Sequence, residues 1–320
     1  MEYFGIKEED SRNNRVLTRV FYLLFALSGA ASLIYEVVWV RQFAQILGAS
    51  SYAVTIILST FMGGLGLGAW LIGKKADRFE GKRLVSTYVL LELGIGLYSL
   101  LLPSLLGWVE GLYVAFHQSY APSLLIFNGF RLLLAAMLLI LPTTLIGATL
   151  PILSRYLIRR QDHIAVPVSR LYAMNALGGF LGTVLAGYFL LPGLGIHLTT
   201  ALAVSLNGLV AGVFWLVNLP LNTIATPEPR TQMITKVRDP EMSPLQKAVL
   251  TGCFLSGAAA MFYEVAWTRT LCMILGTTTF AFSTMLATFL LGIALGSALY
   301  GHVKRILPGA QLIIVLQFLV

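Results

Sequence analysis

Residues 28–48 read SGAASLIYEVVWVRQFAQILG, and residues 256–276 read SGAAAMFYEVAWTRTLCMILG, the same pattern 228 positions later. Each copy has a Tyr-Glu pair, a Trp three residues after the Glu and an Arg two residues after the Trp. Both copies lie in apolar runs typical of membrane helices, where charged residues are rare. The repeat therefore predicts a membrane protein of two related halves, with a site near these residues. The repeated residues are Tyr35, Glu36, Trp39, Arg41, Phe61, Gly64, Gly68 and Gly73 in the first copy and Tyr263, Glu264, Trp267, Arg269, Phe289, Gly292, Gly296 and Gly301 in the second.

The composition excludes a soluble globular protein. Hydrophobic residues make up 57% of the 320 positions and charged residues 11%, against about 25% charged residues in soluble domains. A net charge of +8 would suggest nucleic acid as the partner of a soluble chain. Here most basic residues lie between the apolar runs, where they set membrane topology, so the expected partner is a lipid bilayer and not a nucleic acid.

The apolar runs predict an all-α integral membrane fold with eight full spans and the start of a ninth. Several runs exceed the ~20 residues that a span requires, which indicates tilted or extended helices. The last run is too short to cross a bilayer, so we expect the second half to be incomplete in this chain. The expected spans are 20–46, 51–72, 84–106, 123–153, 169–191, 197–218, 247–275 and 279–301, followed by 309–320.

Basic residues cluster in every second loop, and this alternation predicts the orientation. The N-terminus is expected on the cytoplasmic side of the inner membrane, so both copies of the repeat start on that side and run parallel. The predicted division is a cytoplasmic tail at 1–19, a first six-helix half at 20–218, a proline-containing cytoplasmic linker at 219–246 and the start of the second half at 247–320.

This layout resembles the major facilitator superfamily, in which two six-helix halves are related by an axis along the membrane normal. The loop at residues 73–83, GKKADRFEGKR, is similar to the superfamily signature G-x-x-x-D-R-x-G-R-R, with one inserted residue, Glu80. On this resemblance Gly73, Asp77 and Arg78 form a structural signature at the cytoplasmic face. The alternative is an ordinary basic loop.

Pairs of glycines four residues apart predict close packing between helices and not substrate contacts. The pairs are Gly64 and Gly68, Gly178 and Gly182, and Gly292 and Gly296.

Ionisable residues inside the spans are the candidate site. At about 1.5 Å per residue, Glu36 lies about 24 Å above the cytoplasmic end of its span and Arg131 about 12 Å below the outer end of the fourth. We therefore expect a pair between Glu36 and Arg131 in the outer half of the membrane. Glu92 lies nearer the cytoplasm, and Glu264 is expected to find its partner on a tenth span.

Two interpretations of these charges stay open. They either satisfy one another and hold helices together, or they bind or relay protons or a cationic solute. In the second case Tyr35 and Trp39, which share one helix face, offer aromatic surfaces to a cation. Arg41 and Arg269 lie near the outer interface, where their side chains can reach the headgroups.

The sequence predicts no catalytic residue, no cofactor and no metal site. Cys253 and Cys272 are 19 residues apart on one expected helix and cannot meet, because each residue adds about 1.5 Å. The histidines lie near span ends or in loops, without the spacing of a metal or haem pair; they are His117, His163, His197 and His302.

The repeated segments, together with residues 147–155, GATLPILSR, and 171–179, LYAMNALGG, are similar to the membrane portion of bacterial fused facilitator/spermidine synthase-like proteins. The resemblance implies a Rossmann-like aminopropyltransferase domain after the helices, which would use decarboxylated S-adenosylmethionine to alkylate an amine. No glycine-rich turn in a soluble βαβ setting appears in these 320 residues, so the family's catalytic residues have no positions here.

Three functions follow as hypotheses. The first is transport of a small polar or cationic solute, such as a polyamine, bound between the halves. The second is a membrane anchor for a downstream aminopropyltransferase-like enzyme domain absent from this chain. The third is a structural subunit that packs against partner membrane subunits.

Overall fold

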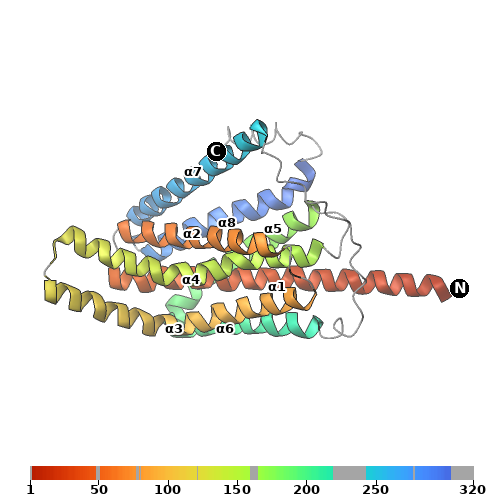
Figure 1. Ribbon diagram of the computed structural model, residues 1–320, viewed down its shortest axis with the longest axis horizontal. Helices are drawn as coiled ribbons and strands as arrows, with labels where there is room; N and C mark the ends of the chain where they lie inside the picture. Colours follow the sequence, from red (N-terminus) through yellow and green to blue (C-terminus); the bar gives the residue numbers. More distant parts are fainter. Residues whose placement is uncertain are drawn as a thin grey trace.

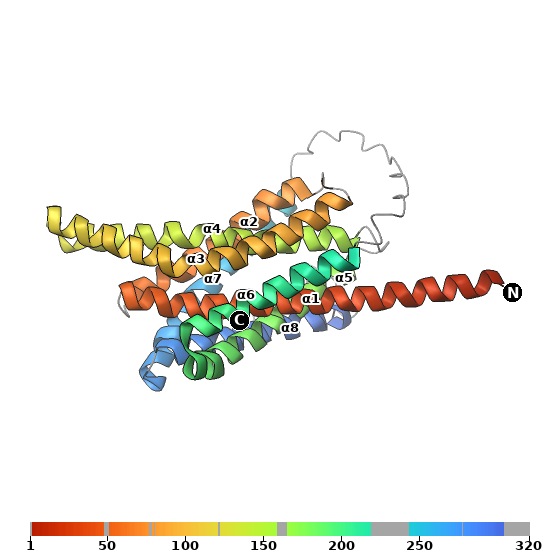
Figure 2. The same ribbon diagram turned by 90° about the horizontal axis from the view of Figure 1, so that it is seen from below.

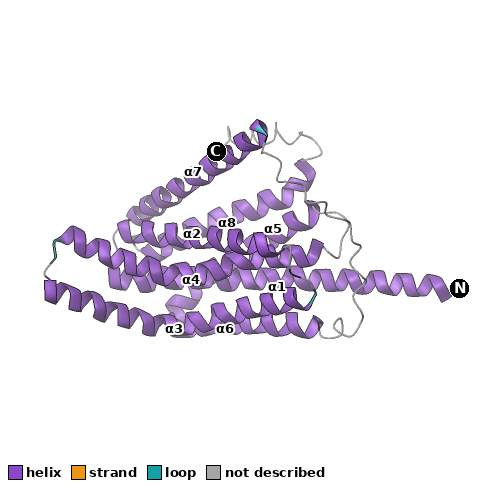
Figure 3. Ribbon diagram, in the orientation of Figure 1, coloured by secondary structure: helices purple, strands orange, loops and turns teal. Residues whose placement is uncertain are grey.

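The computed structural model describes residues 2–47, 51–76, 79, 81–120, 122–158, 165–218, 243–276 and 278–303. Every regular element within these residues is a helix (Figure 3). Seven helical runs are long and apolar enough to cross a membrane, which agrees with the expected all-α class and permits a multi-pass membrane protein. The elements are α1 (Glu2–Leu47), α2 (Ser51–Ala76), α3 (Lys82–Tyr120), α4 (Leu124–Ile158), α5 (Ala165–Val184), η1 (Leu185–Leu190), α6 (Leu191–Asn218), α7 (Pro244–Leu275) and α8 (Thr278–Val303).

Helix α1 runs through the middle of the bundle, and the other helices surround it (Figures 1 and 2). It packs mainly against α5 and α6, and it touches α2, α4 and α8 as well. Helix α2 lies along α4, α3 lies along both α4 and α6, and α5 lies along α8. Helix α7 is at the edge, where it contacts α8 and one short stretch of α2. The first copy of the repeat is therefore central and the second is peripheral.

The closest helix contact joins α1 and α5, and it depends on glycine. A Cβ added at Gly178 would overlap the backbone of Ala26, and one added at Gly182 would overlap the backbone of Ala30. Side chains at either glycine would push the two helices apart. The predicted packing role of this glycine pair is confirmed.

The glycine pair of α2 has the same role, but its counterpart in α8 does not. A Cβ at Gly64 would overlap the Thr143 side chain of α4, and one at Gly68 would overlap the α4 backbone. At Gly292 and Gly296 an added Cβ meets no atom within 4 Å among the described residues. Both copies of the repeat thus contain the glycine pair, but among the described residues only the pair in α2 lies against another helix.

The break expected between the fifth and sixth spans, at 192–197, falls at Gly195. Its φ of 76° and ψ of −178° lie outside the helical region, in a conformation that glycine adopts without steric cost. A π-helical turn, η1, precedes the break, and the hydroxyl of Tyr188 in that turn bonds to Thr284 in α8.

Most of the loop expected at 107–122 is helical, as far as Tyr120, which corrects the sequence prediction. Helix α3 continues to Tyr120 despite Pro103, and together with α4 it projects beyond the end of α1 (Figures 1 and 2). Aromatic pairs hold this hairpin together: Phe116 and Phe130 have ring centroids 4.5 Å apart, and Tyr113 and Phe127 have theirs 5.9 Å apart. These cross-helix contacts extend the helices past the point where hydropathy falls.

Three predicted features lie wholly or partly outside the described residues. The run at 309–320 is outside them, and so is most of the linker at 219–246, of which α7 takes the last residues from Pro244. In the signature loop Asp77 and Arg78 are also outside, whereas Gly73 belongs to α2.

Candidate functional site

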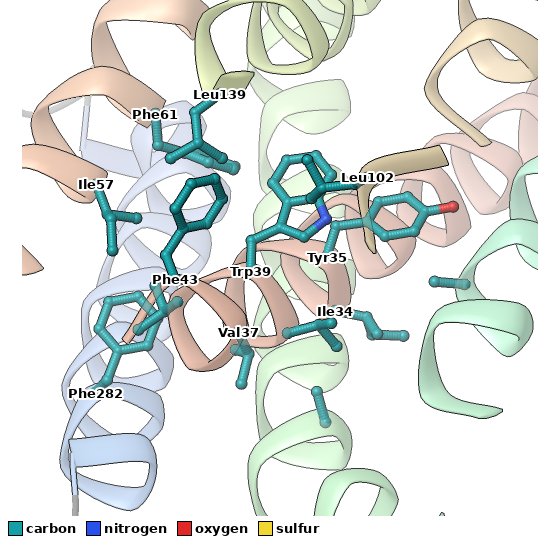
Figure 4. Close-up of a cluster of buried hydrophobic side chains, with 14 of the residues drawn as sticks. Ile34, Tyr35, Val37, Trp39, Phe43, Ile57, Phe61, Leu102, Leu139 and Phe282 are labelled. Carbon is teal, nitrogen blue, oxygen red and sulfur yellow. The ribbon is translucent and has the colours of Figure 1, made fainter. Parts of the chain in front are cut away.

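The repeated segment of α1 is the core of the bundle. Tyr35 and Trp39 are 0% and 1% exposed, and their rings stack with centroids 5.5 Å apart, as their spacing on one helix face predicted. Phe61 and Leu102 pack around them (Figure 4). The Trp39 indole nitrogen has no hydrogen-bond partner among the described residues, so it is buried at some energetic cost.

The two repeated glutamates, Glu36 and Glu264, are both buried inside the molecule. Glu36 is 1% exposed and Glu264 is 2% exposed, and their carboxyl groups interact electrostatically. Neither oxygen of Glu36 has a hydrogen-bond partner among the described residues, and the same is true of Oε1 of Glu264. Both carboxyl groups are therefore buried in an apolar interior, and no basic residue of the described chain is among the groups that act on either of them.

The second copy of the repeat buries the face of α7 that carries Glu264 and leaves its aromatic residues exposed. Glu264 and Thr268 are buried, and the Thr268 hydroxyl donates to the carbonyl of Glu264 over 2.8 Å. Tyr263 and Trp267, by contrast, are 50% and 59% exposed. Because α7 packs at the edge, the same sequence pattern buries its aromatic residues in α1 and exposes them in α7.

The expected pair between Glu36 and Arg131 does not form. The guanidinium of Arg131 lies 5.1 Å from the ring centroid of Tyr113 and 5.4 Å from that of Phe127, in the projecting hairpin. The depth arithmetic assumed that α1 and α4 end at the same height. Helix α4 begins beyond the point where α1 ends (Figure 1), so counting residues from the helix ends does not give the relative heights of Arg131 and Glu36.

The partner of Glu264 on a tenth span stays a prediction. Of the two repeated arginines, Arg41 is half-buried and Arg269 is exposed. Within the described residues no group of three or more His, Cys, Asp or Glu side chains gathers where it could hold a metal ion.

A second polar cluster lies around Glu92, which is 0% exposed. The Ser28 hydroxyl donates to Oε1 of Glu92 over 2.6 Å, joining α1 to α3. The Asn207 side-chain amide of α6 donates to the Glu92 carbonyl over 3.2 Å, and the Tyr35 hydroxyl donates to Asn207 Oδ1 over 3.5 Å. Uncharged side chains of α1 and α6 thus hydrogen-bond to Glu92 of α3 and connect the three helices.

Sequence reasoning found Glu92 but missed the residues around it. Tyr88 lies four positions before Glu92, so it shares a helix face with it, and this spacing was a usable signal. Ser28 begins the quoted repeat, yet nothing in the sequence shows that it faces the third helix. Asn207 is a polar residue in an apolar run, which marks it as buried against a partner without naming that partner.

Comparison with known proteins finds distant similarity to polyamine aminopropyltransferases. The chain is 25% identical over 179 residues to the "Polyamine aminopropyltransferase" of Leptospira interrogans, a match that covers 56% of this chain and 32% of that protein. It is 27% identical over 188 residues to "Polyamine aminopropyltransferase 2" of Ralstonia nicotianae, covering 58% of this chain and 32% of the relative. "Polyamine aminopropyltransferase 1" of the same organism matches at 27% identity over 188 residues, covering 58% and 31%.

The chain thus spans about a third of the length of the curated relatives it matches. No family model matches the chain, and no solved structure matches it. All three relatives carry polyamine aminopropyl transfer in their names.

Proposed function

We propose that this chain is a facilitator-like membrane bundle that binds and transports a small amine cation of the polyamine class between the two copies of its repeat. The observation that carries the proposal is that Glu36 and Glu264, equivalent residues of the two copies, are both buried, and that Glu264 acts electrostatically on the Glu36 carboxyl, with no basic residue of the described chain among the groups that act on either one. Carboxyl groups in apolar surroundings require a proton or a cation as partner. An ammonium group has three donors and can bridge two carboxylates.

The chemistry of the relatives supports the choice of ligand. Polyamines are flexible chains with several ammonium groups, and three proteins similar to this chain are named for aminopropyl transfer to polyamines. A polyamine could place one ammonium between Glu36 and Glu264 and extend its methylene chain along apolar side chains. Arg131 lies apart, over two aromatic rings, so it is not part of this amine site.

Access to the carboxyls requires movement of α7. Both groups are sealed from solvent in the described conformation. Helix α7 is the least buried of the seven apolar runs in the described part of the chain, so its contacts with the bundle cost the least to break. The proposed motion swings α7 away from α1 and exposes both glutamates to the same side. In this proposal the N-terminus lies in the cytoplasm and the bundle in the inner membrane.

Binding of radiolabelled spermidine to the purified chain in liposomes tests the proposal. Each of Glu36→Gln and Glu264→Gln is expected to weaken binding about tenfold, since a charge-assisted hydrogen bond contributes about 1.5–3 kcal/mol and 1.4 kcal/mol corresponds to a factor of ten. Uptake should fall in parallel. The matched control is Glu110→Gln, at an exposed glutamate of α3, which should leave both measurements unchanged. Unchanged binding in both buried variants would exclude the site.

The second candidate is an anchor for an aminopropyltransferase domain, and the names of the relatives favour it. Under this hypothesis the bundle positions an enzyme that lies outside these 320 residues. Membranes carrying the whole reading frame would then transfer an aminopropyl group to putrescine, and this activity would survive Glu36→Gln and Glu264→Gln. Loss of the activity in these variants would count against a purely anchoring role.

A further inference from the structure

Glu92 has the features of a functional carboxyl but lies apart from the two repeated glutamates. It lies in α3, is fully buried, and uses one oxygen: Oε1 accepts from the Ser28 hydroxyl. Oε2 has no hydrogen-bond partner among the described residues. A buried carboxyl oxygen without a donor is costly when the group is ionised.

The surroundings of Glu92 on α1, α3 and α6 contain no charge-balancing group. Its own helix contributes the Tyr88 hydroxyl, which lies beside the carboxyl. From α1 come Ser28 and the Tyr35 hydroxyl, the latter interacting electrostatically with Glu92. From α6 comes the neutral amide of Asn207, which donates to the backbone.

The ionisable residues of α4 do not balance Glu92 either. Arg131 lies over aromatic rings in the projecting hairpin, and Tyr156 donates to Asn218 over 2.6 Å. Arg155 is near the other end of α4 and is not among the groups that act on the Glu92 carboxyl. A carboxylate at this position would thus be buried without a cation, which costs several kcal/mol.

We propose that Glu92 is a proton-binding site of this protein, separate from the amine site at Glu36 and Glu264. The proton resides on Oε2, because Oε1 already accepts the Ser28 hydrogen bond. On release the proton passes to water and leaves a carboxylate that Ser28 and the nearby Tyr88 hydroxyl can both solvate. Proton binding and release at this residue require no other reactant.

The sequence repeat supports a distinct role for this residue. The 228-residue offset that pairs Glu36 with Glu264 places Leu316 opposite Tyr88 and Val320 opposite Glu92. The amine-site glutamate is therefore duplicated, whereas the proton-site glutamate and its tyrosine are found in the first copy alone. A duplicated residue suits a ligand shared by both halves, and a single one suits a proton held by one half.

The contacts also supply a physical connection between the two sites. Tyr35 precedes Glu36 on α1, and its hydroxyl bonds to Asn207, which in turn bonds to the Glu92 backbone. A shift of α1 on amine binding would move the Tyr35 and Ser28 hydroxyls relative to Glu92 and so change the proton affinity of the Glu92 carboxyl. This coupling rests on the proposed function, whereas the proton site itself does not.

Infrared difference spectroscopy tests the proton site directly. The wild-type chain should show the C=O stretch of a protonated carboxylic acid that is missing in Glu92→Gln. Ser28→Ala should keep the band but shift it to higher frequency, because the carbonyl oxygen loses its hydrogen bond. Thr149→Val, which removes a buried hydroxyl that donates to the Ile146 carbonyl within α4, is the matched control and should leave the band in place. A wild-type spectrum without a Glu92-dependent band would overturn the proposal.

Uptake driven by a pH gradient tests the coupling and separates it from the amine site. Spermidine uptake by wild-type proteoliposomes should respond several-fold to an imposed pH gradient, and Glu92→Gln should keep spermidine binding but lose this response. An unchanged response in Glu92→Gln would overturn the coupling. If the infrared band is present but the wild type binds no spermidine, the amine-transport function fails while the proton site stands.

Discussion

Replacing Trp39 with alanine is expected to lower the free energy of unfolding of the 320-residue chain by about 3 kcal/mol or more. Trp39 is 1% exposed and is among the largest fully buried side chains in the described structure. Its removal leaves a cavity between α1, α2 and α3 and abolishes the stacking with Tyr35, which alone contributes about 0.5–1.5 kcal/mol. Because a membrane helix stays in apolar surroundings when it dissociates, the lost packing and not the transfer from water should supply most of this effect. Denaturation of the detergent-solubilised protein with increasing dodecyl sulfate measures it.

The repeat provides the control for this experiment. Trp267→Ala makes the same chemical change at the equivalent residue, which is 59% exposed, and should alter stability by at most about 0.5 kcal/mol. A large difference between the two variants is the expected result. Equal losses would mean that α7 is packed as deeply as α1, contrary to the arrangement described above.

Replacing Gly178 with alanine is expected to destabilise the chain by about 1–3 kcal/mol, although alanine is the better helix former. The added methyl group would overlap the backbone of Ala26, and backbone atoms cannot rotate away as a side chain can. Relief requires α1 and α5 to separate along the contact that Gly182 also makes with Ala30. The same denaturation assay measures the loss, and cross-linking between cysteines placed on α1 and α5 should become less efficient.

Gly292→Ala in α8 is the matched control. An added Cβ there meets nothing within 4 Å in the described structure, so the substitution should be neutral or stabilising by up to about 1 kcal/mol through helix propensity. We expect Gly178→Ala to lower the stability of the chain and Gly292→Ala to leave it unchanged or raise it. A loss at Gly292 as large as that at Gly178 would show that the α8 face is occupied by another helix.

Hydropathy and glycine spacing predict much of the fold. The apolar runs locate the helices, because a segment that spans a bilayer must satisfy its backbone hydrogen bonds internally. The glycine pairs of α2 and α5 mark the closest contacts, since only a missing side chain permits such an approach. The sequence alone does not show that α3 continues to Tyr120, because that extension depends on aromatic contacts with α4.

The candidate site is less predictable, and Glu36 shows why. Its presence in an apolar run marks it as a buried, functional candidate, and the structure places it in the interior. Its neighbour depends on how the helices are staggered, which residue counting along each helix does not give. Because α4 is staggered relative to α1, Arg131 lies over an aromatic ring of the projecting hairpin and not beside Glu36. The residue that acts electrostatically on Glu36 is Glu264 of α7.

The long hairpin of α3 and α4 extends beyond one end of the bundle. Helix α3 has 39 residues, and at about 1.5 Å each it is much longer than the ~30 Å hydrocarbon layer. At the opposite end, α1 extends from Glu2 to the start of its apolar stretch at Arg19 (Figures 1 and 2). In the proposed membrane placement, an epitope tag on either extension would lie outside the lipid on opposite faces of the membrane, so antibody labelling of intact and opened cells would report the orientation of the protein.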